Sequence, residues 1–332
     1  MFLEKIKNYS LKSYLSNGVS GVIFLTEKEN SEEKFVTKVI RMTDKDQSSM
    51  MKNEVDILRM VSHENIVRYV DFIETNETFY LIMEYIKGYT LRELLVKYTQ
   101  KMKKNLPECF VRNIARQICS ALEYLHSHSI VHRDLKLENI MFEFPKDEES
   151  FDNIENVKGK VKIIDFGFSR ISNKEEMMSS VFGTPVTMSP QILESIYTGK
   201  LSKYDYKTDI WSLGIIIYEL LFGFLPFKSD SLKILMDSLE IGNYFINIKQ
   251  NVSKEFVEFI QGLIQYEPKN RNDWKIIMNQ DFIRTNSETK TIDPSKLEKS
   301  SINKDSIVLN LHKSICLNED REVFKKIVCI FY

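Results

Sequence analysis

The stretch His132-Arg-Asp-Leu-Lys-Leu-Glu-Asn139, HRDLKLEN, is the most specific in the chain. It places a carboxylate, Asp134, and an amide, Asn139, five residues apart, with Lys136 between them. These residue types suit phosphoryl transfer, because the carboxylate can orient a hydroxyl, the lysine can face phosphate and the amide oxygen can bind Mg²⁺. Taken alone, the stretch is also compatible with an ordinary surface loop.

A second stretch, Ile164-Asp-Phe-Gly-Phe168, follows downstream. Here Asp165 ends an apolar strand, which is a natural position for a second metal ligand. By itself this stretch also fits a simple turn. The two stretches in this order favour a phosphoryl-transfer centre over two unrelated loops.

A third stretch, Leu15-Ser-Asn-Gly-Val-Ser-Gly-Val-Ile23, contains two glycines three residues apart. Gly18 and Gly21 fit any tight turn that needs positive φ, so an ordinary hairpin and a phosphate-holding loop both remain open on these residues alone.

Composition and charge narrow the class of protein. The chain has 332 residues, with 46 basic and 47 acidic side chains and a formal net charge of −1, so neither nucleic acid nor an anionic membrane is expected as a partner. Its four cysteines are scattered without a CxxC, which favours a reducing compartment. The start lacks the apolar core of a signal peptide, and the longest apolar run, Leu213 to Phe227, is interrupted by Glu219. We expect a cytoplasmic protein without a membrane span.

Periodicity divides the chain into two lobes. Residues 11–85 contain β-branched and aromatic runs such as VIFLTE and KFVTKVIRM, with one helical pattern at Asn53 to Val61. From about residue 90 to residue 285 the patterns are helical, and DIWSLGIIIYELLFG is apolar on nearly every face. The sequence therefore predicts an α+β fold with a small β-rich N-lobe and a larger helical C-lobe.

Two polar segments lie outside this pattern. Residues 143–160 are polar with few apolar anchors and are expected to form a surface insertion. Residues 286–332 begin with a polar linker and end in a tail that regains apolar residues. The tail is a candidate for binding a regulatory partner.

Together these motifs resemble eukaryotic-type protein kinases, over a domain expected to span residues 11–285. The resemblance implies a bilobal fold with ATP between the lobes, Mg²⁺ as the metal and proteins as substrates. DFGFSR and MSPQIL are most similar to autophagy-initiating kinases and to calcium/calmodulin-type relatives.

Carried over residue by residue, the resemblance implies that Asp134 is the catalytic base and that Lys136 and Lys38 also act in catalysis. It implies Asn139 and Asp165 as the Mg²⁺ ligands. The residues implied at the nucleotide are Leu15, Gly18, Gly21, Ile23, Val36, Lys38, Glu54, Met83, Glu84, Ile86 and Met141.

The position of Lys38 then favours a phosphate-holding role for the glycine-rich stretch. Lys38 lies seventeen residues past Gly21, a distance that fits one hairpin return. Phosphate is therefore expected under Gly18 and Gly21. Val36 and Thr37, beside Lys38, are expected to form the pocket wall.

Several residues depart from the family pattern. Ser16 replaces the first glycine of the loop, Leu137 a usual proline, Thr187 an aromatic residue and Gln191 a glutamate. The glutamate normally pairs with a buried arginine, matched here by Arg271. We expect Gln191 and Arg271 to meet beneath the activation segment.

Two functions remain open on the sequence. The first is an active serine/threonine protein kinase, which the complete set of matched active-site residues favours. The second is a non-catalytic kinase-fold scaffold or nucleotide-binding pseudokinase, favoured only by the departures. Ser180, with Ser179 as second choice, is the expected site of regulatory phosphorylation, and Arg133 is the cation expected to receive the phosphate.

Overall fold

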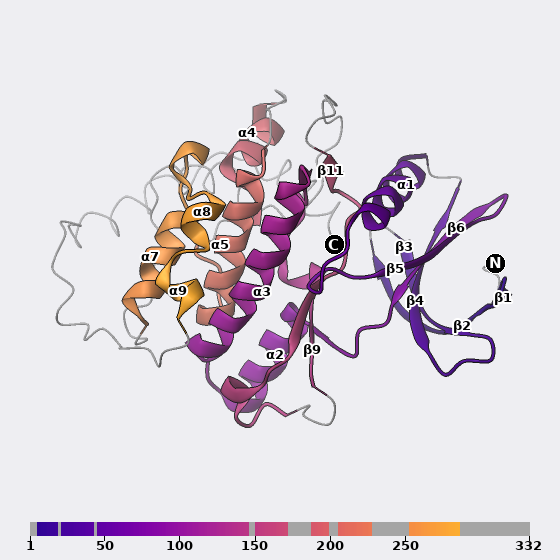
Figure 1. Cartoon of the computed structure of the whole chain (residues 1–332), viewed down its shortest axis with the longest axis horizontal. Helices are drawn as coiled ribbons and strands as arrows, with labels where there is room; N and C mark the ends of the chain where they lie inside the picture. Colours follow the sequence, from indigo (N-terminus) through magenta and orange to yellow (C-terminus); the bar gives the residue numbers. More distant parts are fainter. Residues whose placement is uncertain are drawn as a thin grey trace, which may run out of the picture.

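The computed structural model describes residues 5–18, 21–42, 45–145, 150–171, 187–198, 205–227 and 252–285. Figure 1 shows a β-rich N-lobe at the right, in indigo, and a helical C-lobe at the left. The expected α+β fold with two lobes is confirmed.

Six antiparallel strands form the sheet of the N-lobe, in the order β1-β2-β3-β4-β6-β5. They are β1 Lys5–Ile6, β2 Tyr9–Gly18, β3 Gly21–Lys28, β4 Lys34–Arg41, β5 Tyr69–Glu74 and β6 Thr78–Glu84. Side chains alternate along a strand, so Phe35 and Val39 of β4 share one face and Lys38 lies on the other. A small apolar cluster that includes Ile6 and Tyr9 covers the first face.

Helix α1, Lys45–Met60, packs against β4, β5 and β6. Its Met51, Val55 and Leu58 are buried in the main core, because spacings of four and three residues place them on one side of a helix. The helix therefore covers the face of the sheet on which Lys38 lies.

The hairpin between β2 and β3 ends at the pair Gly18 and Gly21. Gly21 has a φ of +133°, and a Cβ at this position would lie 2.8 Å from the Ile40 side chain and 2.9 Å from the carbonyl oxygen of Val39. Only glycine fits such a backbone position without strain. Ile23 of β3 pairs with Lys38 of β4, which is the single hairpin return expected from the spacing.

Helices form most of the C-lobe, with α5 buried along its whole length between α3 and α7 (Figure 1). The helices are α2 Leu91–Met102, α3 Glu108–Ser127, α4 Pro190–Thr198, α5 Lys207–Phe222, α7 Lys254–Leu263, α8 Trp274–Ile277 and α9 Asp281–Arg284. The apolar character of α5 on every face follows from this central position. The helix ends at Gly223, whose φ of +75° is readily adopted by glycine.

Short strands and turns shape the part of the C-lobe that faces the N-lobe. Strands β7, β9 and β10 form one small sheet, and β8 pairs with β11. Their bounds are β7 Gly88–Thr90, β8 Ile130–Val131, β9 Ile140–Glu143, β10 Lys160–Ile163 and β11 Arg170–Ile171, with 3₁₀ turns η1 Leu137–Asn139, η2 Ile154–Asn156 and η4 Pro268–Asn270.

The segment 143–160 connects β9 to β10, and its described part is anchored more firmly than its polar composition suggested. Ile154 is fully buried and Phe144 is 8% exposed. The ring of Phe151 lies 5.9 Å from that of Tyr98 on α2. This part of the segment therefore packs on the C-lobe through a few well-placed apolar side chains.

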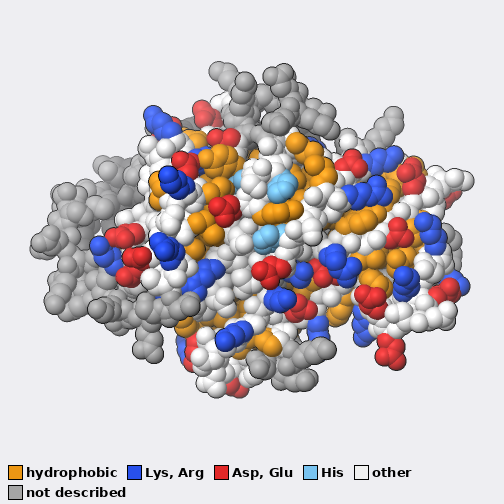
Figure 2. Space-filling view, viewed as in Figure 1, with side chains coloured by type: hydrophobic (Ala, Val, Ile, Leu, Met, Phe, Trp, Pro, Cys, Tyr) orange, Lys and Arg blue, Asp and Glu red, His pale blue; other side chains and the backbone are white. Residues whose placement is uncertain are grey.

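Basic and acidic side chains are interspersed over the described part of the face shown in Figure 2, which agrees with the near-zero net charge. Among the described helices, none has both the length and the apolar character that crossing a membrane would require.

Candidate active site

Three charged side chains from both lobes meet where the lobes join. Lys38 Nζ donates to Glu54 Oε2 at 2.6 Å and to Asp165 Oδ1 at 3.2 Å. The side chains of Lys38 and Glu54 are only 4% and 1% exposed. Strand β4, helix α1 and the segment after β10 each supply one residue, so the structure brings together three residues that the sequence singled out.

The charges of this cluster stabilise one another. Burial works against the charged form of Lys38, but Asp165 and Glu54 outweigh it and raise the pKa of the lysine. Burial likewise favours the neutral acid at Asp165, yet Lys38 and the Gly167 N–H lower the pKa of this carboxyl to about 2. Both side chains are therefore charged at neutral pH.

Asp134 lies on the loop between β8 and η1 and is 5% exposed. Its Oδ2 accepts a hydrogen bond from Asn139 Nδ2 at 2.9 Å and lies 2.9 Å from Lys136 Nζ. Its Oδ1 is buried and has no hydrogen-bond partner within the part of the chain that the structure describes. A buried carboxylate oxygen without a donor is costly, so this atom is suited to a hydroxyl supplied from outside.

Asn139 and Asp165 supply oxygen atoms of the kind that Mg²⁺ prefers. Asn139 Nδ2 donates to both the carbonyl oxygen and the Oδ2 of Asp134, at 2.9 Å each, which leaves its Oδ1 available to a cation. Ile164, the residue before Asp165, donates its N–H to Asn139 O at 3.0 Å, so the two chain segments lie side by side here. This donor set fits Mg²⁺, and the roles of the two residues as ligands stay predictions.

A buried carboxylate on α5 holds the backbone just before Asp134. Asp209, which is fully buried, accepts hydrogen bonds from His132 N at 2.8 Å and from Arg133 N at 2.9 Å. Arg133 has a φ of +70°, a conformation that costs a non-glycine residue about 1–3 kcal/mol. The two hydrogen bonds stabilise this strained turn and so fix the direction of the loop that carries Asp134.

His126 and Trp274 extend this support through contacts that the sequence did not indicate. His126 Nε2 donates to Asp209 Oδ2 at 2.8 Å, and Trp274 Nε1 donates to His126 Nδ1 at 2.8 Å. The donor on Nδ1 fixes the tautomer in which Nε2 carries the proton. No local pattern joins three residues so far apart in the chain, so only the fold reveals the connection.

The residues expected at the nucleotide come from both lobes. They lie on β2 and β3 (Leu15, Gly18, Gly21, Ile23), on β4 (Val36, Lys38), on α1 (Glu54), at the end of β6 and just beyond it (Met83, Glu84, Ile86) and on β9 (Met141). Val36 pairs directly with Met83 across β4 and β6 and shares the face of Lys38. Contacts of these residues with ATP stay predictions.

Thr37 does not belong to this wall, contrary to expectation. Because side chains alternate along β4, Thr37 points to the opposite face from Val36 and Lys38. There it is 1% exposed, and its Oγ1 accepts a hydrogen bond from Thr26 Oγ1 at 2.6 Å.

Part of the predicted site lies outside the described residues. This holds for residues 19–20 at the tip of the glycine-rich hairpin and for residues 172–186. The second range contains Ser179 and Ser180, so their regulatory role also stays a prediction.

Gln191 and Arg271 meet, as the sequence predicted. Arg271 is 2% exposed, and its Nη2 donates to Gln191 Oε1 at 2.7 Å. Its other hydrogen bonds go to the backbone carbonyls of Gln265, Lys207 and Tyr266, so among the described residues its hydrogen-bond acceptors are neutral oxygens. Burial lowers the pKa of Arg271 to about 10.

We expect Gln191→Glu to stabilise the protein by about 1 kcal/mol at neutral pH, because a carboxylate compensates the buried guanidinium. The gain is limited, because Gln191 Nε2 also donates to Tyr266 O at 2.8 Å and a carboxylate loses that bond. The expected rise in melting temperature is roughly 2–4 °C.

The pH dependence of unfolding checks this expectation. Arg271 should depress the pKa of the new carboxyl below that of the unfolded chain, so the gain is present above about pH 4.3 and disappears as the pH falls through the folded pKa. Glu194→Gln, at an exposed position of the same helix, is the control. A gain that persists in acid would contradict the ion-pair explanation.

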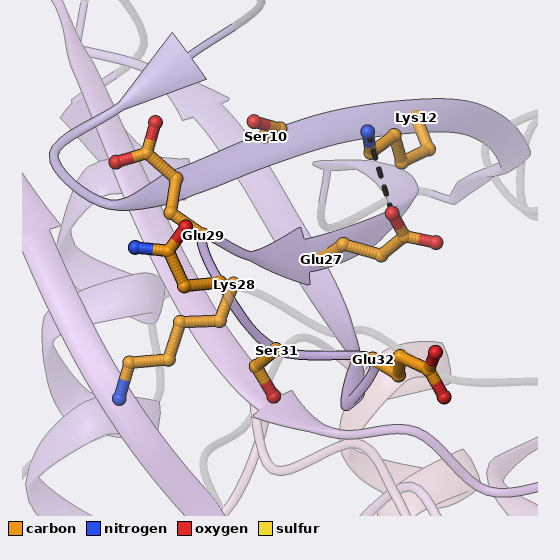
Figure 3. A pocket seen from close by; sticks show the side chains of 8 residues that line it. Ser10, Lys12, Glu27, Lys28, Glu29, Ser31 and Glu32 are labelled. Atoms are coloured by element: carbon orange, nitrogen blue, oxygen red, sulfur yellow. Dashed lines mark ion pairs between the residues drawn. The ribbon is translucent and has the colours of Figure 1, made fainter.

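A surface cavity of about 370 Å³, shown in Figure 3, lies apart from these residues. It is lined by Ser10, Lys12 and residues 27–32, with both signs of charge facing it. Those residues lie at the end of β3 opposite to Gly21, roughly 20 Å along the strand. The cavity is thus separate from the charged cluster and is not assigned a role in it.

Comparison with known proteins agrees with this arrangement. The protein kinase domain family matches residues 9–283. Over 301 residues, the chain is 33% identical to myosin light chain kinase A of Dictyostelium discoideum, with 90% of this chain and 94% of the relative covered. It is 31% identical to the serine/threonine-protein kinase TIO of Arabidopsis thaliana, with 85% of this chain and 20% of the relative covered. It is also 31% identical to serine/threonine-protein kinase 36 of Mus musculus, with 84% of this chain and 19% of that relative covered.

The family match covers both lobes and all the charged residues described above. With a family match over most of its length and relatives named as kinases, the chain belongs to the eukaryotic-type serine/threonine protein kinases.

Proposed function

We propose that this protein is an active kinase that transfers the γ-phosphate of ATP to serine or threonine hydroxyls of protein substrates. The observation that carries the proposal is Asp134, a buried carboxylate with one oxygen fixed by Asn139 and Lys136 and the other without a donor among the described residues. The arrangement leaves one defined acceptor for an incoming hydroxyl. The complete Lys38–Glu54–Asp165 cluster supports the same function.

In the proposed reaction, Asp134 Oδ1 accepts the hydrogen bond of the substrate hydroxyl and orients its oxygen toward the γ-phosphorus. A bond forms between that oxygen and the phosphorus while the bond from phosphorus to the β–γ bridging oxygen breaks, which leaves ADP. The hydroxyl proton passes to Asp134. Lys136, beside Asp134, offers positive charge to the transferred group, and Lys38 offers it to the α- and β-phosphates.

Members of this family use ATP with Mg²⁺. Asn139 and Asp165 would hold the metal in this chain, and Mg²⁺ supplies charge neutralisation of the phosphates when bound. Glu54 keeps Lys38 in place, since its Oε2 accepts a hydrogen bond from Nζ at 2.6 Å.

The pH profile tests the role of Asp134 as base. Burial raises the pKa of Asp134 above its ordinary value, and Lys136 opposes this shift. A base acts only when deprotonated, so kcat/KM should fall in acid, and Lys136→Met should move that fall to higher pH because it removes the opposing charge. Profiles between pH 5 and pH 8 check this, with the exposed Lys101→Met as control. An acid limb that stays in place or moves to lower pH would rule out this coupling.

The scaffold function is the second candidate. Its support is limited to Ser16, Thr187 and Gln191, which differ from the family pattern. Gln191 still binds Arg271, and the carbonyl of Thr187 accepts a hydrogen bond from Ser212 Oγ at 2.9 Å, so neither departure disrupts the packing around it. We also propose a cytoplasmic location, on the basis of the scattered cysteines.

A further inference from the structure

Helix α1 presents one face to the segment that follows Asp165. Asn53 and Glu54 follow Met50 by three and four residues, so both lie on the side of the helix that carries Met50. A Cβ placed on Gly167 would be 3.6 Å from Met50 Cε and 3.7 Å from Glu54 Oε2, which are ordinary contact distances. The backbone of the segment therefore passes directly against this face of α1.

The segment forms a tight turn that α1 holds at both ends. Ser169 N donates to Phe166 O at 3.0 Å, which closes the turn over residues 166–169. Phe166 N donates to Glu54 Oε1 at 3.3 Å, and Asn53 Nδ2 donates to Ser169 O at 2.8 Å. Two consecutive residues of α1 thus bind the first N–H and the last carbonyl of the same turn.

Ser169 also connects this turn to the catalytic loop. Its side chain is fully buried, and its Oγ donates to His132 O at 3.3 Å. The next residue, Arg170, pairs with Val131 between β11 and β8. A displacement of Ser169 would therefore reach the loop that carries Asp134.

We propose that Asn53 is a positioning residue for the phosphoryl transfer proposed above. By binding Ser169 O, it fixes the turn that carries Asp165 relative to the Lys38–Glu54 pair. Asn53 lies beside Glu54 on α1 and is linked to the active centre through the Ser169 backbone, so it acts through that turn.

The second attachment matters because a turn held at one end can pivot about that end. Glu54 holds the Phe166 end only. Arg170 Nη1 also donates to Ser169 O, at 2.8 Å, but Arg170 belongs to the segment itself and moves with it. Of the two donors to this carbonyl within the described part of the chain, Asn53 is the one that ties it to α1. Its loss should let the Ser169 end of the turn pivot relative to α1 about the end that Glu54 holds.

The experiment compares Asn53→Ala with Asn53→Gln and with Asp56→Ala, an exposed position on the same helix. Two quantities are measured on the full chain: hydrogen exchange of the amides in residues 166–171, and kcat with KM for a peptide substrate. Asn53→Ala should speed that exchange and lower kcat about 3- to 10-fold, as expected for one hydrogen bond, with KM changed less than about twofold. Asn53→Gln keeps an amide donor and should recover part of both quantities.

Exchange and kcat in Asn53→Ala that both match Asp56→Ala would overturn the proposal. A lower kcat with unchanged exchange would overturn it too, because Asn53 would then act by another route. A wild-type protein without any phosphoryl transfer would contradict the proposed kinase function. The exchange data, which need no activity, would still decide whether Asn53 fixes the turn.

Discussion

Asp165→Asn is expected to lower kcat for phosphoryl transfer by a factor on the order of 10³, with the fold retained. The amide keeps the shape of the side chain, but it loses the negative charge that would hold the metal and face the phosphates. Lys38 keeps its 2.6 Å contact with Glu54, so the substitution leaves no buried cation without a carboxylate. The measurement is transfer of labelled γ-phosphate to a peptide, together with the melting temperature.

Asp152→Asn is the matched control, since it makes the same chemical change at a side chain that is 67% exposed. It should leave both transfer and melting temperature unchanged. Transfer in Asp165→Asn within about tenfold of wild type would remove Asp165 from the proposed metal site. A large loss of melting temperature would mean that the residue is mainly structural.

Lys38→Met is expected to abolish transfer and also to destabilise the protein by about 3–5 kcal/mol. Asp165 also loses its cation, but its side chain is 24% exposed, so the stability loss arises mainly at Glu54, which is 1% exposed and would remain buried without its cation. The double variant Lys38→Met with Glu54→Gln removes the stranded charge and should regain most of this stability without regaining activity. Thermal unfolding of both variants checks the expectation.

The sign of the pH dependence sharpens this test. Burial already raises the pKa of Glu54, and loss of Lys38 removes the main opposing charge. The pKa of Glu54 in the folded variant should therefore lie above its value in the unfolded chain, so that between these two pKa values the folded protein binds a proton that the unfolded chain releases. The stability deficit of Lys38→Met relative to the double variant is therefore full above the folded pKa. It should shrink as the pH falls toward the unfolded value of about 4.3. A deficit that is independent of pH would point to lost packing.

The sequence predicted those contacts of the site whose residues match the pattern of the protein kinase family. The resemblance to protein kinases placed Lys38 and Glu54 together at the nucleotide, and the structure brings them into contact at 2.6 Å. Gln191 and Arg271 were also placed together, from the family pattern. The family pattern was sufficient in these cases, although Arg271 lies in the turn after η4 and in no helix or strand.

The remaining contacts depend on how elements pack, which spacing alone does not encode. Thr37 was misplaced because the sequence reasoning gave two adjacent strand residues the same face, although side chains alternate. The contacts of Asn53, His126 and Trp274 were not predicted, because their partners lie on elements distant in the chain. The spacing of Met50, Asn53 and Glu54 on one helix face was a usable signal for Asn53, but it does not identify what packs against that face.

Phosphoryl transfer by the wild-type protein and by Asp134→Asn tests the proposed function most directly. Both proteins are preincubated with ATP and Mg²⁺, then mixed with serine- and threonine-containing peptides, and phosphopeptide formation is followed by mass spectrometry. We expect the wild type to phosphorylate hydroxyl residues and Asp134→Asn to do so at least about 10² times more slowly, since the orienting carboxylate is lost. Nucleotide binding by the wild type without transfer to any peptide, or equal transfer by the two proteins, would contradict the proposed role of Asp134 and favour a kinase-fold scaffold.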